Sequence, residues 1–470
     1  MQSVEAAPRA PVAASRAWRA YLTVGAAWVS LIVVVGIWLA GDGLSILRDP
    51  GGPATSLGRV SGLGGADLLL IQVLLMARIP WVEAWYGQDT LARWHRIAGF
   101  TSFWLMMVHV LLITVGYGQT DGLGLVREAW DLTFNYPGML LAVAGTALLT
   151  LVVVLSIRAA RRKLRYESWH LLHLYAYLGI GLMLPHVVWT GQDFTSSALA
   201  RAYWWTLYAA ALAAVLVYRV GLPLWRSQHH QLRVHAVTKE APGVVSVYLR
   251  GRNLHRLPAR AGQFFLWRFL DGPGWSRAHP YTLSAAPRPL NSPTRGSAHP
   301  FEVRITVKNL GDGSARVARL RPGTRVLIEG PLGAVTANRR TRRKVLLIAA
   351  GVGITLIRSI LDDLPAEWGD VTVLYRVGDK KEIVFRKELE AFAQARGDRV
   401  VYLEGRRGPS WLPAHLSHLG GRDALLWLVP DVADHDVFVC GPPSWMDGVV
   451  ASLHAAGVAP VNIHREEFAW

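Results

Sequence analysis

Residues 94–117 read WHRIAGFTSFWLMMVHVLLITVGY, an apolar stretch long enough to cross a bilayer as a single helix. The stretch contains two histidines, His95 and His109, with thirteen residues between them. An ionisable side chain inside a membrane span is costly, so each of these histidines asks for a functional reason. The stretch therefore predicts a membrane helix whose two histidines are candidate ligands.

Five further apolar runs precede about Leu224, after which the chain reads like a soluble protein. Hydrophobic residues make up 51% of the 470 residues, a share that is high for a soluble protein. We therefore predict a six-helix membrane domain over residues 18–225, followed by a soluble module. The second run is the weakest, because it is short and contains Asp67. The predicted spans are residues 18–40, 63–80, 94–117, 137–158, 169–190 and 200–222.

The basic residues predict how the chain lies in the membrane. A net charge of +17 could indicate a nucleic-acid binder, but no motif supports one, so we expect no nucleic-acid partner. The basic residues instead flank apolar runs, as in RAARRKLR at 158–165, a pattern typical of the cytoplasmic ends of membrane helices. This places both termini in the cytoplasm, with the spans in the plasma (inner) membrane. The run RRTRRK at 339–344 is interpreted as a solvated linker.

Two further features limit the possibilities. The Ala- and Pro-rich start, residues 1–17, is predicted to be a disordered cytoplasmic tail, and the run after it is predicted to be a retained first span. The only cysteine is Cys440, which excludes an intramolecular disulfide and a cysteine-ligated iron–sulfur cluster. Redox chemistry would therefore need other cofactors.

The fifth run holds a second histidine pair, His173 and His186, with twelve residues between them. The third and fifth spans run in the same direction, so their first histidines share one depth and their second histidines another. A neutral imidazole is a good axial ligand to haem iron. We predict an inner haem held by His95 and His173, and an outer haem held by His109 and His186. The alternative is that these histidines only bond to neighbouring helices.

The helix geometry supports this prediction unevenly. Fourteen residues of helix rise about 21 Å and bring His109 nearly onto the face of His95. Thirteen residues at about 100° each leave His173 and His186 well apart around a straight helix, unless Pro185 distorts it. His170 is left over: it could hydrogen-bond a haem propionate or lie at the membrane interface, and the interface is favoured.

After about Gln228 the pattern changes to short alternating segments, such as VVSVYLR at 244–250 and FEVRITV at 301–307. Turn residues separate them, which predicts a small antiparallel β-barrel over residues 228–337. From Lys344 onward, apolar strands such as VLLIAAGVGI alternate with helical stretches. That alternation predicts an α/β, Rossmann-like domain over residues 343–470.

The segment HPYTLS, from His279 to Ser284, could bind a flavin. Tyr281 could lie against the flavin ring, and Thr282 could bond to its polar edge. Downstream, Lys308 and the turn Gly311-Asp312-Gly313-Ser314 offer a cation, backbone amides and a hydroxyl for a pyrophosphate. An ordinary strand and a plain hairpin are the alternatives.

Three segments near the carboxy terminus could bind a nicotinamide nucleotide. AAGVGIT, residues 349–355, follows a strand and precedes a helix, so its glycines would let the backbone approach a pyrophosphate. Arg376 could accept a 2′-phosphate or be a solvated charge. Cys440-Gly441-Pro442-Pro443 ends a strand, and its cysteine could lie near the nicotinamide or be a buried small residue. In the final EEFAW, Phe468 or Trp470 could stack on the flavin or belong to a packed terminus.

Taken together, HPYTLSAAP, GDGS, AAGVGIT, CGPP and the terminal EEF resemble the ferredoxin–NADP reductase superfamily. The membrane half resembles the ferric-reductase-like transmembrane domain. The combination resembles the NADPH oxidase and ferric reductase family in a prokaryotic form, over about residues 60–470.

This resemblance implies a role for each motif. His95, His173, His109 and His186 would ligate two b-type haems. FAD would be bound by His279, Pro280, Tyr281, Thr282 and Ser284, with Lys308, Gly313 and Ser314 on its pyrophosphate and Thr282 near its reactive edge. NADPH would be bound by Gly351, Gly353, Ile354, Thr355 and Arg376, with Cys440, Gly441 and Pro442 beside the nicotinamide. Phe468 would cover the flavin.

The sequence thus predicts a membrane oxidoreductase that takes electrons from NADPH through FAD and two haems to the outer face. Oxygen, giving superoxide, is the acceptor favoured by the family resemblance. A ferric chelate and a protein or quinone partner remain alternatives. A transporter or sensor with a nucleotide-reading domain is the alternative that involves no enzyme.

Overall fold

The computed structural model describes residues 12–157, 166–289 and 301–466. The chain forms two compact units, which are described separately. One is helical and comprises residues 14–79 and 90–218. The other is built mainly from the chain after Arg219, together with residues 80–89.

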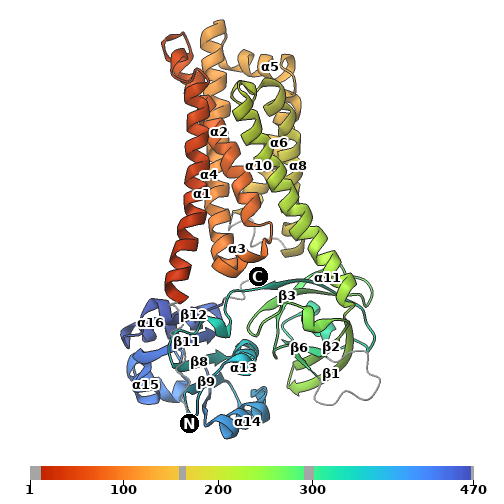
Figure 1. The fold of residues 1–470 in the computed structure, drawn as a ribbon, viewed down its shortest axis with the longest axis vertical. Coiled ribbons are helices and arrows are strands. Elements are labelled where there is room, and N and C mark those ends of the chain that lie inside the picture. Colours follow the sequence, from red (N-terminus) through yellow and green to blue (C-terminus); the bar gives the residue numbers. More distant parts are fainter. Residues whose placement is uncertain (1–11, 158–165, 290–300, 467–470) are drawn as a thin grey trace, which may run out of the picture. The chain divides into compact units, whose positions relative to one another are not determined.

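The described residues contain six helices that are long and apolar enough to cross a membrane. This confirms the predicted multi-pass membrane protein. Shorter helices include α3 (Pro80–Tyr86), α5 (Leu125–Asn135) and α9 (Gln192–Thr195). The long helices, labelled in Figure 1, are α1 (Val12–Ala40), α2 (Gly52–Leu75), α4 (Gln88–Asp121), α6 (Met139–Ser156), α8 (Tyr166–Thr190) and α10 (Ala198–Ala214), which continues through Val215–Gly221 into α11 (Leu222–His230).

Two predicted boundaries differ from the structure. Helix α1 begins at Val12, so residues 12–17, expected in a disordered tail, are helical. Helix α2 spans Gly52–Leu75 rather than residues 63–80. Its first half is rich in glycine and serine, which lowers the hydropathy but allows close helix contact. Pro80 then begins α3, a position in a helix that suits proline.

Small and polar residues hold the membrane helices together. A Cβ atom added to Gly145 of α6 would lie 2.6 Å from the Gly179 carbonyl oxygen of α8, so these helices touch backbone to backbone. Asp67, the unexpected acid of α2, is buried and accepts hydrogen bonds of 2.7 Å from Ser30 of α1 and from Tyr203 of α10. The carboxyl group therefore ties three helices together.

The first soluble domain consists of two antiparallel sheets, with strand orders β1-β2-β6-β5 and β4-β3-β7. Single bridges join the sheets, one of them between Leu283 and Ile305. Apolar residues such as Phe265 and Trp267 fill the core. The predicted antiparallel domain is confirmed. Its strands are β1 (Arg233–Ala241), β2 (Val244–Arg250), β3 (Phe264–Phe269), β4 (His279–Thr282), β5 (Arg288–Pro289), β6 (Phe301–Lys308) and β7 (Val326–Leu332).

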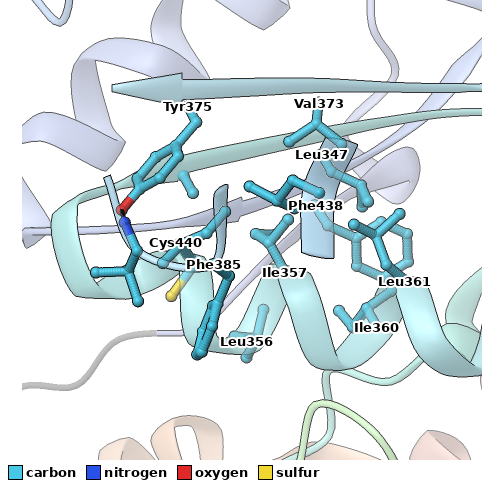
Figure 2. Packing of buried hydrophobic residues seen from close by; sticks show 14 of the residues in the cluster. Leu347, Leu356, Ile357, Ile360, Leu361, Val373, Tyr375, Phe385, Phe438 and Cys440 are labelled. Carbon is cyan, nitrogen blue, oxygen red and sulfur yellow. Dashed lines mark hydrogen bonds between the residues drawn. The ribbon is translucent and has the colours of Figure 1, made fainter. Parts of the chain in front are cut away.

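The second soluble domain is a five-stranded parallel sheet of order β10-β9-β8-β11-β12 with helices packed on it, as predicted. Figure 2 shows Leu347, Val373 and Phe438 of the sheet packed against Ile357 and Leu361 of a helix. The elements are β8 (Lys344–Ala350), α13 (Ile354–Asp363), β9 (Val371–Val377), α14 (Arg386–Arg396), β10 (Arg399–Glu404), α15 (Gly421–Leu428), β11 (His435–Cys440), α16 (Pro443–Ala455) and β12 (Ile463–Arg465).

Candidate functional site

Two pairs of histidines face each other between α4 and α8. The ring centroids of His95 and His173 are 5.9 Å apart, and those of His109 and His186 are 6.4 Å apart. An imidazole nitrogen binds a metal ion at about 2 Å, and the ring centre lies about 1 Å behind it, so two imidazoles on one iron would be ~6 Å apart. Both pairs fit an iron between their rings. The structure thus brings His186 to face His109 from a helix that contains Pro185.

On α4, backbone carbonyls of α2 orient both histidines. Nδ1 of His95 lies 3.1 Å from the carbonyl oxygen of Gln72, and Nδ1 of His109 lies 2.8 Å from that of Gly58. A carbonyl can only accept, so each Nδ1 carries the proton. The lone pair of each ring is therefore on Nε2, the nitrogen that would bind iron.

On α8, hydroxyl groups instead of carbonyls place the proton of each histidine on Nδ1. Nδ1 of His186 lies 2.7 Å from Oγ1 of Thr190, which itself donates to a backbone carbonyl at 2.7 Å. Nδ1 of His173 lies 3.3 Å from Oγ of Ser156, which donates to the carbonyl of Val152 at 2.7 Å. Each hydroxyl hydrogen is already used, so the hydroxyl accepts from Nδ1. All four histidines share one tautomer.

The HPYTLS segment forms β4 and pairs with β3, with Tyr281 opposite Phe265. Tyr281 is partly buried, and burial raises the pKa of its hydroxyl to about 12, so the side chain stays neutral. Its ring stacks on that of His279, with 6.1 Å between centroids. The start of α12 (Asp312–Val317) reaches the same place, because a Cβ on Gly313, its second residue, would lie 2.7 Å from the His279 ring. The structure therefore brings the two proposed flavin motifs together.

The AAGVGIT segment forms the end of β8, a tight turn and the start of α13, as predicted. Gly351 has a φ of 54°, which favours glycine. A Cβ on Gly353 would lie 2.3 Å from the carbonyl oxygen of Cys440. Since β8 and β11 are adjacent parallel strands, the Gly turn and Cys440-Gly441 meet at their carboxyl ends. Ligands commonly bind at this edge of α/β sheets.

Cys440 itself is fully buried, and desolvation raises the pKa of its thiol far above its usual value. The thiol is therefore neutral and lies in the apolar core seen in Figure 2. Among the other predicted residues, Ile354 and Thr355 begin α13, Pro442 precedes α16, and Lys308 ends β6. Phe468 and Trp470 lie outside the described residues.

The side chains of Arg376 and Ser284, both predicted to bind ligands, bond within the protein instead. The Arg376 guanidinium is buried and donates to the backbone carbonyls of Val377, Leu403 and Arg406. The Ser284 hydroxyl accepts hydrogen bonds from Thr306 at 2.8 Å and from the Arg304 guanidinium at 3.2 Å, and none of the serine is exposed. Both groups stabilise the fold at the positions where ligand contacts were expected.

Comparison with known families identifies two parts of the chain. Residues 61–184 match the family described as "Ferric reductase like transmembrane component", and residues 347–451 match "Oxidoreductase NAD-binding domain". The chain therefore combines a membrane domain of the ferric-reductase type with an NAD-binding oxidoreductase domain. As a ferric-reductase-type protein, it joins a membrane domain to FAD- and NAD(P)H-binding domains and is an NAD(P)H-dependent oxidoreductase.

Individual relatives resemble about half of this ferric-reductase-type chain. "NADH oxidoreductase HCR" of Escherichia coli is 28% identical over 249 residues, which are 52% of this chain and 68% of the relative. The ferredoxin reductase component of 3-ketosteroid-9-alpha-monooxygenase from Mycobacterium tuberculosis is 30% identical over 240 residues, 49% of this chain and 62% of the relative. The FAD/NAD-binding domain of a nitric oxide dioxygenase from Vibrio cholerae shares 24% identity and covers 51% of this chain and 99% of its own, with a TM-score of 0.37.

Sequence reasoning missed several groups in this ferric-reductase-type protein. The carbonyls of Gly58 and Gln72 carry no signal in the sequence, because every residue has a carbonyl. Arg304 did leave a signal, since it is a charged residue in the middle of the apolar segment FEVRITV. A buried charge needs a partner, and its partner is Glu388 of α14.

Proposed function

We propose that the protein carries electrons from cytoplasmic NADPH, through FAD and two b-type haems, to an acceptor on the outer face of the membrane. The observation that supports this proposal best is that α4 and α8 carry two facing pairs of imidazoles, and in each pair the rings have the spacing that one iron needs. Bound haem and flavin supply the redox chemistry: the flavin accepts a two-electron hydride, and each haem iron carries one electron. The protein binds and orients these groups.

A task is proposed for each residue from its sequence motif, supported for the described residues by the contacts given above, and for Phe468 from the resemblance alone. His95 with His173, and His109 with His186, hold the irons through Nε2. His279, Pro280, Tyr281 and Thr282 face the flavin, with Lys308, Gly313 and Ser314 at its pyrophosphate. Gly351, Gly353, Ile354 and Thr355 take the nucleotide pyrophosphate at the start of α13, beside Cys440, Gly441 and Pro442, and Phe468 covers the flavin. The bonds of Arg376 to carbonyls do not support contact with a 2′-phosphate, so NADPH as the donor rests on the resemblance.

The proposed acceptor is oxygen, reduced to superoxide, as the resemblance to NADPH oxidases implies. A ferric chelate is the second candidate, because the matching membrane family is described as ferric-reductase-like. The excess of basic residues at the amino terminus, at 158–165 and after α10 supports a plasma-membrane protein with both termini in the cytoplasm.

The test is an anaerobic visible spectrum of the purified protein in detergent, before and after addition of FAD and NADPH. A b-type haem spectrum that becomes reduced supports the electron path, and admission of oxygen or a ferric chelate then identifies the acceptor. Folded protein without haem would refute the proposal.

A single ligand variant tests the two-haem assignment. His109→Leu should lose the second haem and stop transfer to the outer acceptor, because only the iron between His95 and His173 keeps both ligands. Reduction of the flavin by NADPH should persist. Unchanged transfer in this variant would contradict the ligand assignment.

A further inference from the structure

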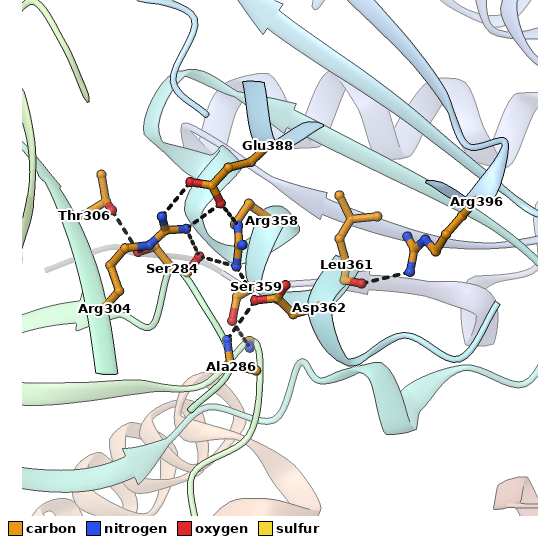
Figure 3. Close-up of polar contacts among 11 residues, drawn as sticks. Ser284, Ala286, Arg304, Thr306, Arg358, Ser359, Leu361, Asp362, Glu388 and Arg396 are labelled. Carbon is orange, nitrogen blue, oxygen red and sulfur yellow. Dashed lines mark hydrogen bonds and ion pairs between the residues drawn. The ribbon is translucent and has the colours of Figure 1, made fainter. Parts of the chain in front are cut away.

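A network of charged side chains joins the two soluble domains (Figure 3). Glu388 of α14 accepts hydrogen bonds from Arg304 of β6 at 2.6 and 3.0 Å, and from Arg358 of α13 at 2.5 Å. The arginine side chains are only 8% and 4% exposed. One carboxylate thus bridges two buried guanidiniums, one from each domain. Arg304, Arg358, Glu388 and Asp362 are called the inter-domain network below.

The inter-domain network holds the backbone that follows the flavin strand. The carbonyl oxygen of Ser284 accepts from Arg304 at 3.0 Å and from Arg358 at 3.3 Å. The backbone N–H of Ala286 donates to Asp362 at 3.2 Å, and Arg358 forms an ion pair with the same carboxylate. Ser284 follows Thr282 of the flavin motif by two residues. The network therefore fixes the chain at the end of β4.

The inter-domain network also holds the AAGVGIT turn, which is the proposed nucleotide-binding turn and is called the nucleotide turn below. Arg358 and Asp362 lie on α13, the helix that begins with the AAGVGIT turn. Arg358 follows Thr355 by three residues, which is about 4.5 Å along the helix axis. A helix is rigid over this length, so a group that holds Arg358 also holds the turn. A second tie on this helix is the hydrogen bond of 3.2 Å from the Gly262 N–H to Oγ of Ser359.

The charge balance of this network depends on Glu388. Partial burial opposes its ionisation, but the hydrogen bonds and charges of Arg304 and Arg358 hold the pKa of Glu388 below its usual value. The carboxylate is therefore ionised at neutral pH. Loss of that charge would leave the buried Arg304 guanidinium without its carboxylate partner, beside Arg358, which would keep its ion pair with Asp362, and an unpaired buried charge is costly.

We propose that Arg304, Arg358 and Glu388 are positioning residues for hydride transfer, because they hold the nucleotide turn at a fixed distance from the flavin strand. This inference rests on the proposed function, in which NADPH reduces FAD. Hydride transfer requires the two rings to be in contact, and misplacement by about 1 Å can lower the rate by roughly 100-fold.

The variant Glu388→Gln tests the proposal in the full-length protein, and Glu390→Gln is the matched control. Glu390 lies on the same helix and pairs with Arg386 at 2.8 Å, but that pair is exposed. NADPH is mixed anaerobically with the FAD-loaded protein, and two signals are followed: flavin reduction and the long-wavelength charge-transfer absorbance of stacked nicotinamide and flavin. We expect Glu388→Gln to reduce its flavin at least tenfold more slowly with a weaker charge-transfer band, while its FAD and haem content stay normal. Glu390→Gln should match the wild type.

A wild-type rate and band in Glu388→Gln would overturn the proposal. If this variant does not retain FAD, Glu388→Asp decides, because it keeps the charge but is one methylene too short to reach both guanidiniums. A slower rate with normal FAD content in Glu388→Asp supports positioning, and a wild-type rate overturns it. Failure of NADPH to reduce the flavin of the wild-type protein would instead refute the proposed function.

Discussion

Replacing Gly62 with alanine should remove one haem from the protein, whereas replacing Gly64 should remove none. A Cβ at position 62 would lie 2.5 Å from Nδ1 and 2.9 Å from Cε1 of His109, and distances under 3.0 Å force a shift. At position 64 the nearest atom is Cδ1 of Leu105 at 3.8 Å, an ordinary contact. The two positions lie on one helix, so the comparison isolates the effect on the histidine.

The size of the effect follows from how firmly the ring is held. Nδ1 of His109 bonds to the carbonyl of Gly58 at 2.8 Å, so the ring cannot turn away from Gly62 without losing that bond. Overpacking of this kind costs about 1–3 kcal/mol, which corresponds to an affinity for the second haem that is roughly 5 to 150 times lower.

The assay is the haem-to-protein ratio of the purified variants, measured as the pyridine haemochrome, together with their reduced visible spectra. Gly62→Ala should contain about half the haem of the wild type, and Gly64→Ala the full amount. Two haems per chain with an unchanged spectrum in Gly62→Ala would refute the assignment of His109 as a ligand.

Three further predictions concern the soluble domains. Burial alone would raise the pKa of Asp436, but hydrogen bonds from His464 and its other neighbours lower this pKa to about 2. The stabilisation is therefore present above pH ~4, and the free energy of unfolding should fall by about 2 kcal/mol as the pH drops toward 2. A pH series of denaturant titrations measures this fall, which Asp436→Asn should not show. Gly353→Ala should raise the KM for NADPH at least tenfold in ferricyanide reduction without changing the haem spectrum. The reason is that the new Cβ would lie only 2.3 Å from the Cys440 carbonyl oxygen and would displace the turn. An unchanged KM would exclude this turn from the nucleotide site. Phe438→Ala should cost ~3–5 kcal/mol in chemical denaturation, since the ring is fully buried, and a loss below 1 kcal/mol would mean that the core closes over the cavity.

Much of the architecture could be predicted because it depends on local patterns. Apolar runs of sufficient length predicted the membrane helices, and alternation predicted both kinds of sheet. The start of α2 was missed, because its glycines and serines lower the hydropathy while they allow close packing against α4. Residues 12–17 were predicted to belong to a disordered tail, but α1 begins at Val12.

The site was predictable only in part, because some contacts have no local signal. The histidine spacing identified four side chains that the fold does pair. It could not identify the Gly58 carbonyl, which is a backbone group, or the pairing of Arg304 with Glu388, which are far apart in the sequence. Arg376 and Ser284 looked available for ligands, but burial turned both toward the protein itself.

The hydrogen bonds of the histidines decide which residues could adjust the proposed electron path. In each pair, the imidazole from α4 bonds to a backbone carbonyl, which substitution cannot remove. The imidazole from α8 bonds to a hydroxyl, that of Ser156 in one pair and that of Thr190 in the other. A hydrogen bond at Nδ1 makes an imidazole a stronger donor to its metal, so it influences the reduction potential. Each proposed haem site would therefore be held by one histidine fixed by a backbone carbonyl and one histidine fixed by a replaceable hydroxyl, and a single substitution at Ser156 or Thr190 could change the driving force between the two sites.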